Sequence, residues 1–123
     1  MKRKILIVED NVGLSQIQKD WLSRAGYDAV TAMSEPIARS LIRKTQFDLI
    51  LSDVRLPEGD GISLLEWLRK EKKDIPFIIT TEFVSVPDVV RTIKLGARDY
   101  LPKPVYRDHL LELAEDVFHP VAP

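Results

Sequence analysis

Three carboxylates stand at the ends of two short apolar runs in this chain. Glu9 and Asp10 follow the run at 5–8, and Asp53 ends the run at 49–53. Carboxylates that are crowded together repel one another unless a cation lies between them, and oxygen ligands of this kind suit Mg²⁺. A carboxylate can also attack a phosphoryl group and form an acyl phosphate. If the fold brings the three residues together, they predict a Mg²⁺ site around a nucleophilic aspartate, Asp53.

A hydroxyl and an amine follow two later apolar runs. Thr81 ends the run at 76–81, and Lys103 lies two residues after the run at 99–101. Phosphoryl transfer depends mainly on positioning and on stabilisation of the charged oxygens, which an ammonium and a hydroxyl can supply. We therefore group Lys103 and Thr81 with Asp53 as the residues that carry the chemistry. Each has an ordinary alternative, such as a solvated surface lysine, but all of them fall at predicted strand ends.

Strands and helices are predicted to alternate five times along the chain. The runs at 5–8, 27–31, 48–53, 76–81 and 99–101 predict the strands. Strict alternation is typical of a parallel sheet with right-handed crossovers and helices on both faces. The predicted fold class is α/β, a doubly wound five-stranded parallel sheet of order 2-1-3-4-5 with five helices.

This strand order has a chemical consequence. In open α/β sheets, ligands bind at the carboxyl edge where the strand order reverses, here between the first and third strands. Glu9, Asp10 and Asp53 leave those two strands, so we expect them to converge on one crevice. Thr81 and Lys103 are expected at the same edge.

The helices are predicted from capping residues and from apolar residues at helical spacing. Asn11 caps the first helix, and Pro87 starts the fourth. The side chains expected to face the sheet include Leu14, Ile17, Trp21 and Leu22 in the first helix and Val89, Val90 and Ile93 in the fourth.

Length and composition limit the possible functions. The 123 residues are 45% hydrophobic and 30% charged, which indicates one globular domain. Its 18 basic and 19 acidic residues leave a net charge of −1, so we expect no direct contact with nucleic acid or membrane. Without cysteine there is no thiolate site. The basic start at 2–4 precedes too few apolar residues for a signal peptide or a membrane span, so we expect a cytoplasmic protein.

The residues at these strand ends closely resemble the receiver domain of bacterial two-component response regulators, over essentially the whole chain. Glu9 and Asp10 match the family's acidic pair and Asp53 its phosphoacceptor. Thr81 matches the switch residue and Lys103 the lysine before a proline. The resemblance implies a flavodoxin-like (CheY-like) fold, a Mg²⁺ cofactor and a sensor histidine kinase as phosphodonor. It also implies a regulatory phosphoacceptor that assists its own phosphorylation and dephosphorylation, rather than an enzyme.

The same resemblance assigns further features. Tyr100 matches the switch aromatic, and the backbone carbonyl of Arg55 completes the metal site in this pattern. The bond between Lys103 and Pro104 is implied to be cis. Phosphorylation is implied to switch the conformation and to control an output domain or partner through the fourth helix, fifth strand and fifth helix. A phosphorylation-dependent homodimer would use the same face.

Two stretches, at 53–61 and 96–104, resemble the receivers of NtrC-type, sigma-54-dependent activators. This resemblance implies an output domain that acts in transcription regulation. The alternative is a stand-alone receiver that regulates a partner protein. We expect residues 1–119 to form the receiver domain and 120–123 to be a tail or the start of a linker.

Glu82 departs from the family's pattern, in which the residue after the switch Thr is usually Ala or Gly. Its carboxylate, followed by the bulky Phe83, is expected to repel an incoming phosphodonor or, alternatively, to reach the metal or Lys103 instead. Thr80 as the switch residue would remove this departure, but the spacing to Lys103 favours Thr81.

Two other protein classes share part of this pattern. A haloacid dehalogenase-type phosphohydrolase also combines an Asp nucleophile, Mg²⁺ and a Lys, but it needs an acid where this chain has Arg55. A flavodoxin shares the predicted topology, but Glu9 and Asp10 would repel phosphate in its binding loop. A receiver that is no longer phosphorylated is a third alternative, although no acceptor residue is missing.

Overall fold

The computed structural model describes residues 2–120, in which five strands alternate with five helices. The strands are β1 (Lys4–Val8), β2 (Asp28–Ala32), β3 (Leu49–Asp53), β4 (Phe77–Thr81) and β5 (Asp99–Pro102). The helices are α1 (Val12–Arg24), α2 (Glu35–Lys44), α3 (Gly61–Lys70), α4 (Val86–Lys94) and α5 (Arg107–Phe118). Each strand lies within one or two residues of its predicted position.

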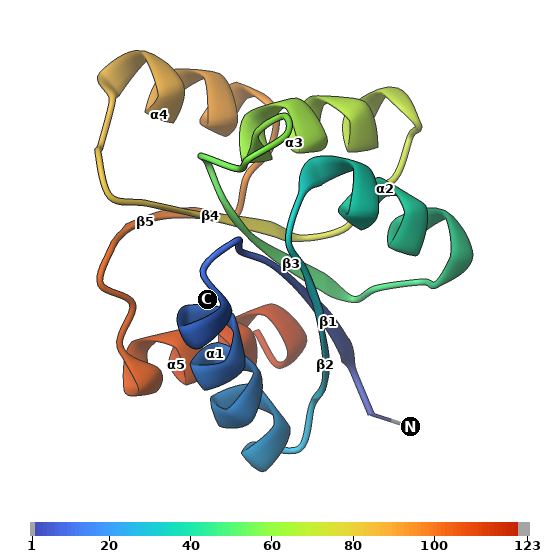
Figure 1. The fold of residues 1–123 in the computed structure, drawn as a ribbon, viewed down its shortest axis with the longest axis vertical. Coiled ribbons are helices and arrows are strands. Elements are labelled where there is room, and N and C mark those ends of the chain that lie inside the picture. The colour runs from blue at the N-terminus through green and yellow to red at the C-terminus, as the bar shows by residue number, and fades with distance from the viewer. Residues whose placement is uncertain (1, 121–123) are drawn as a thin grey trace.

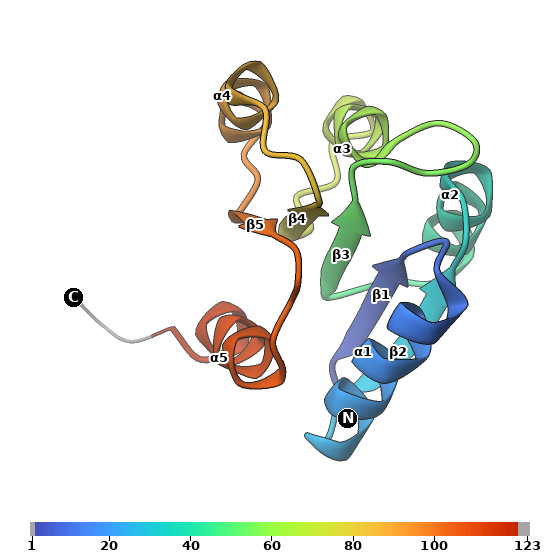
Figure 2. The ribbon, with the colours of Figure 1, turned by 60° about the vertical axis from the view of Figure 1, so that its left-hand side comes forward.

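The strands form one parallel sheet in the order β2-β1-β3-β4-β5, which confirms the predicted fold class and order. Helices α1 and α5 cover one face, and α2, α3 and α4 cover the other (Figure 1). Turned by 60°, the sheet separates these two helical layers (Figure 2). β1 and β3 are neighbours, with Val8 opposite Ser52 at their carboxyl ends. The strand order therefore reverses between them, as predicted.

Apolar side chains fill both faces of the sheet. In β1, Ile5 and Ile7 pack with α1 and α5, while Leu6 and Val8 pack with α2 and α3. Every residue of β3 and β4 is buried, as expected for central strands covered on both faces. β3 therefore holds Asp53 from a strand that is anchored along its whole length. None of the helices described in residues 2–120 combines the length and apolar character of a membrane span.

Helix α1 presents a more polar face to the sheet than the sequence predicts. Leu22 is buried as expected, but Ile17 is 47% exposed, and Ser15 and Gln18 are buried instead. The Ser15 hydroxyl donates to the Val12 carbonyl at 3.0 Å, so its burial leaves no unpaired donor. The prediction that Ile17 faces the sheet is wrong.

Helix α4 differs in the same way. Val90 is 46% and Ile93 65% exposed, whereas Thr92 is fully buried. The Thr92 hydroxyl donates to the Val89 carbonyl at 2.9 Å, so this small side chain faces inward without an unpaired donor. The prediction that Val90 and Ile93 face the sheet is wrong, and α4 has an apolar outer surface.

Candidate functional site

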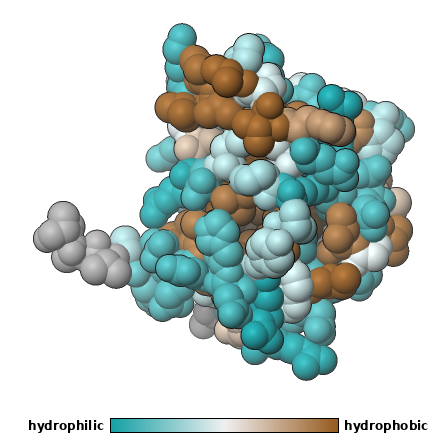
Figure 3. All heavy atoms as spheres, turned by 90° about the vertical axis from the view of Figure 1, so that its left-hand side faces the viewer, coloured by the Kyte–Doolittle hydropathy of each residue, from teal (hydrophilic) through white to brown (hydrophobic). Residues whose placement is uncertain are grey.

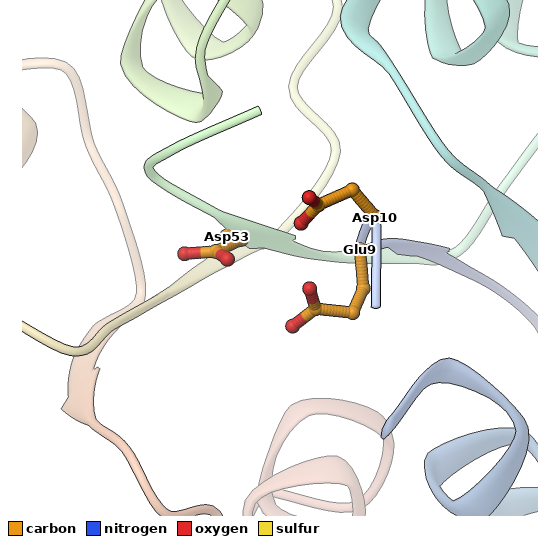
Figure 4. A group of neighbouring side chains, drawn as sticks. All are labelled: Glu9, Asp10 and Asp53. Atoms are coloured by element: carbon orange, nitrogen blue, oxygen red, sulfur yellow. The ribbon is translucent and has the colours of Figure 1, made fainter. Parts of the chain in front are cut away.

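Three carboxylates converge at the carboxyl edge of the sheet. Glu9 and Asp10 leave the end of β1, and Asp53 is the last residue of β3. One oxygen of each carboxylate lies within 4.8 Å of the others, and Figure 4 shows the three side chains turned toward a common space. Glu9 and Asp53 are buried, while Asp10 is exposed. The crevice expected from the topology therefore contains all three predicted acids.

Lys103 joins this group from the end of β5. Its Nζ donates to Glu9 Oε1 at 2.6 Å and to Asp53 Oδ2 at 2.9 Å. Its backbone N–H donates to the Thr81 carbonyl at 2.7 Å, which fixes the end of β5 against β4. The bond from Lys103 to Pro104 is cis, as the family resemblance implied. A single ammonium thus contacts carboxylates from two strands.

Burial and pairing act in opposite directions on this ammonium. Burial alone lowers the pKa of Lys103, but the hydrogen bonds to Glu9 and Asp53 outweigh it and raise the pKa above its ordinary value. Lys103 is therefore a cation at neutral pH. It can stabilise negative charge that develops beside Asp53.

Lys103 offsets only part of the cost of burying the Glu9 carboxylate. Burial raises the pKa of Glu9, against hydrogen bonds from Lys103 and from the Asn11 N–H, which lies 3.1 Å from Oε2. A buried carboxylate of this kind gains from an additional cation nearby. Asp10, Asp53 and Glu9 offer the hard oxygen ligands that Mg²⁺ prefers, so the residues present fit that ion.

A cavity of about 280 Å³ opens beside Asp53. Arg55, which follows β3 and is the predicted carbonyl ligand, lines this cavity together with Glu82. The other lining residues are Asp10, Leu56 and Pro57. Glu82 therefore lines the same cavity as Asp53.

The loops after β3 and β4 meet through a contact that the sequence did not reveal. The guanidinium of Arg55 lies 5.1 Å from the centroid of the Phe83 ring, within cation–π range. Phe83 itself is 63% exposed. The only available signal was a cation and an aromatic residue in loops after adjacent strands.

Thr81 and Tyr100, the two predicted switch residues, lie on the neighbouring strands β4 and β5. Thr81 ends β4 and is buried, and its hydroxyl donates to the Phe83 carbonyl at 3.0 Å. The same hydroxyl accepts from the Phe83 N–H at 3.1 Å, so it bonds to the β4–α4 loop in this structure. Tyr100 lies opposite Ile79 on β5, and its buried hydroxyl has no hydrogen-bond partner among residues 2–120.

Comparison with known protein sequences agrees with this geometry. The family model of the response regulator receiver domain matches residues 5–115. The transcriptional regulatory protein ZraR of Salmonella typhimurium is 40% identical over 114 residues, which are 93% of this chain and 26% of ZraR. The transcriptional regulatory protein GlrR of Escherichia coli is 34% identical over 119 residues, which are 97% of this chain and 27% of GlrR.

Solved structures agree as well. The non-phosphorylated HemR receiver domain from Leptospira biflexa matches with a TM-score of 0.89 and 35% identity, over 99% of this chain and 98% of that one. A CheY-like response regulator receiver domain protein from Methanospirillum hungatei matches with a TM-score of 0.91 and 30% identity, over 98% and 97%.

These matches bear on two of the alternatives that the sequence left open. They favour the receiver over the flavodoxin and the haloacid dehalogenase-type phosphohydrolase. The chain spans about a quarter of the length of the two transcriptional regulators it matches. Since the family model covers 5–115, this chain belongs to the response regulator receiver domain family.

Proposed function

We propose that Asp53 accepts a phosphoryl group from a sensor histidine kinase and that the domain passes this signal on. An Asp53 carboxylate oxygen forms the bond to phosphorus while the bond from phosphorus to the donor imidazole nitrogen breaks, and the histidine leaves with that electron pair. The observation that carries the proposal is the cluster of three carboxylates, two of which, Glu9 and Asp53, form ion pairs with Lys103. The domain acts as a regulatory phosphoacceptor that assists its own phosphorylation and dephosphorylation.

Glu9, Asp10, Asp53 and the backbone carbonyl of Arg55 would hold Mg²⁺. When bound, Mg²⁺ neutralises charge on the transferring phosphoryl group and on the carboxylates. Lys103 holds a proton on Nζ beside Asp53 and stabilises the added oxygens. Thr81 supplies a hydroxyl that can donate to one of them.

Intact-mass spectrometry tests this proposal without the kinase. After incubation with acetyl phosphate and Mg²⁺, the protein is expected to gain the mass of one phosphoryl group. Chelation of the metal before the incubation should prevent the gain. A protein that gains no mass under the first condition would contradict the proposal.

The phosphoryl signal would leave the site through Thr81 and Tyr100. Phosphorylation adds negative charge and acceptor oxygens, which would draw the Thr81 hydroxyl away from Phe83. Space vacated on that side of β4 would admit the Tyr100 side chain, whose hydroxyl has no partner in its present position among the described residues. A side chain with two positions is the kind of element that converts a local charge change into a wider one.

The α4-β5-α5 face is the surface where we propose that this change is detected. Apolar side chains of α4 and its preceding loop are exposed, and Figure 3 shows them gathered at the upper end of this side of the molecule. Large exposed apolar patches are typical of protein contact sites. The exposed apolar residues are Phe83, Val84, Val86, Val90 and Ile93. A phosphorylation-dependent homodimer or an output domain would bind here.

Thr81→Ala is expected to uncouple phosphorylation from this face. Asp53 should still be phosphorylated, but the change in amide hydrogen exchange across residues 83–94 should shrink about tenfold, as for loss of a typical coupling energy. Exchange is followed by mass spectrometry with and without acetyl phosphate. Thr80→Ala, at the adjacent buried position of β4, is the matched control. An exchange response in Thr81→Ala that equals the wild-type response would rule out this relay.

The output is proposed to be transcription regulation, in an NtrC-type regulator. ZraR and GlrR are each more than three times as long as this chain, which supports a further domain that would contact DNA. A stand-alone receiver remains the second candidate. Residues 1–119 are proposed as the receiver domain of a cytoplasmic protein. Of the proposed tail at 120–123, residues 121–123 lie outside the described residues.

Glu82→Ala is expected to speed phosphorylation by acetyl phosphate about threefold, because it removes a negative charge from the entrance to the acceptor. The rate of mass gain at low ionic strength measures the effect. Glu71→Ala, which removes the same charge at the end of α3, is the control and should leave the rate unchanged. Equal rates for Glu82→Ala and the wild type would show that this carboxylate does not hinder the donor.

A further inference from the structure

Glu35 is a buried carboxylate that the proposed phosphoryl chemistry does not use. It is the first residue of α2 and is 4% exposed. Its Oε1 accepts from the Asp60 backbone N–H at 3.0 Å. Its Oε2 accepts from the Ser63 hydroxyl at 3.2 Å and from the Arg39 guanidinium at 2.7 Å. Buried charges persist in proteins when they are paired and hydrogen-bonded, and these partners meet that condition.

The β3–α3 loop, residues 54–60, wraps around this side chain. The Glu35 backbone N–H donates to the Glu58 carbonyl at 3.2 Å, so the main chains are also joined. Gly59 passes so close that a Cβ on it would clash with Glu35 Oε1. Gly59 also has a φ of +76°, a left-handed conformation that favours glycine. Glu35 thus fixes the position of this loop against α2.

The same loop connects Glu35 to the acidic crevice. Asp60, whose N–H donates to Glu35, pairs with Arg55 in an isolated antiparallel bridge that closes the loop. Arg55 lines the cavity beside Asp10 and Asp53. The backbone position of Arg55 therefore depends on where Asp60 is held, and Glu35 holds Asp60.

We propose that Glu35 is a positioning residue that sets the Mg²⁺ affinity of the site by fixing the loop that carries the Arg55 carbonyl. The inference rests on the proposed Mg²⁺-dependent function. It adds α2 to the elements that determine the Mg²⁺ affinity of the site. Groups that hold metal ligands in place typically change metal affinity 10- to 100-fold when they are removed.

Glu35→Ala is expected to raise the Mg²⁺ dissociation constant about tenfold, measured by isothermal titration calorimetry on the full chain. Glu35→Gln retains an acceptor oxygen for the Asp60 N–H, so its dissociation constant should lie within about twofold of wild type. Ile42→Val, a core truncation on the same helix, lowers stability without touching the loop and should bind Mg²⁺ as the wild type does. Urea unfolding of each variant shows whether affinity merely follows stability.

Gly59→Ala disturbs the same contact from the side of the loop and should weaken Mg²⁺ binding by a similar factor. The double variant with Glu35→Ala should bind no more weakly than either single variant, because both changes break one connection. In metal-free protein, the Asp60 amide should exchange at least about tenfold faster in Glu35→Ala than in wild type, since its acceptor is gone. If Glu35→Ala does not fold, Gly59→Ala and Glu35→Gln decide the question.

The possible results distinguish a failure of the Glu35 positioning role from a failure of the proposed Mg²⁺-dependent function. A wild-type protein that does not bind Mg²⁺ would overturn the proposed function, and the role of Glu35 with it. Mg²⁺ binding in the wild type that is unchanged in Glu35→Ala and Gly59→Ala would overturn the positioning role alone. Weaker Mg²⁺ binding by Ile42→Val would also overturn it, because Mg²⁺ affinity would then follow stability rather than the position of the loop.

Discussion

Asp53→Asn is expected to abolish phosphorylation of the domain by acetyl phosphate and Mg²⁺. The amide carries no negative charge and cannot form the acyl phosphate, so the phosphorylated fraction should fall below detection in an intact-mass measurement. The substitution keeps the size of a side chain that is 8% exposed at the end of the buried strand β3. The variant should therefore fold like the wild type.

The control for Asp53→Asn is Asp20→Asn, which removes the same charge from the exposed face of α1. It should be phosphorylated to the same extent as the wild type. Full phosphorylation of Asp53→Asn would mean that another side chain accepts the phosphoryl group. Loss of phosphorylation in both variants would point to net charge rather than to the acceptor.

Lys103→Met is expected to destabilise the metal-free domain by about 3 kcal/mol, as for the loss of one partner from a buried ion pair. The side chains of Lys103, Glu9 and Asp53 are each at most 10% exposed, so water replaces the lost ammonium poorly. Methionine keeps the apolar part of the side chain. Mg²⁺ should restore part of the lost stability, because a ligand that binds only the folded state stabilises it.

Urea unfolding with and without Mg²⁺ measures both effects in Lys103→Met. Lys94→Met, on α4, is the control and should change the free energy of unfolding by less than about 0.5 kcal/mol under either condition. Equal stability of Lys103→Met and wild type in metal-free buffer would contradict the role given to this ammonium. A free energy of unfolding that Mg²⁺ raises in neither protein would contradict the expected metal site.

The sequence predicts the strands and the convergence of the site well, because both depend on burial and topology. An apolar run such as 49–53 suits only a strand covered on both faces, and β3 is that strand. Parallel order 2-1-3-4-5 then brings the ends of β1 and β3 together. The proximity of Asp10 and Asp53 follows without any knowledge of side-chain contacts.

Helix orientation and side-chain partners are harder to predict from sequence. Helical periodicity shows that Val90 and Ile93 share a face with other apolar residues, but it does not show which face the sheet covers. In α4 the sheet covers the face of Thr92, whose hydroxyl is paired within its own helix. The Thr81 hydroxyl bonds to Phe83 because of the conformation of a loop, which no local pattern specifies.

The burial of the charged residue Glu35 is equally hard to predict from sequence. At the start of α2 it has the sequence pattern of an exposed acid in a first helical turn, where carboxylates are common. Its burial depends on a loop 20 to 25 residues later in the chain, through Arg55 and Asp60. A contact of that kind becomes visible only in the folded chain.

The most direct test of the account is the location of the phosphoryl group. The protein is incubated with acetyl phosphate and Mg²⁺, reduced with borohydride to convert an acyl phosphate to an alcohol, digested and mapped by mass spectrometry. We predict one modified residue, homoserine at position 53, and none when the metal is chelated first. Modification at any other residue, or an unmodified Asp53 in the presence of Mg²⁺, would contradict the central claim.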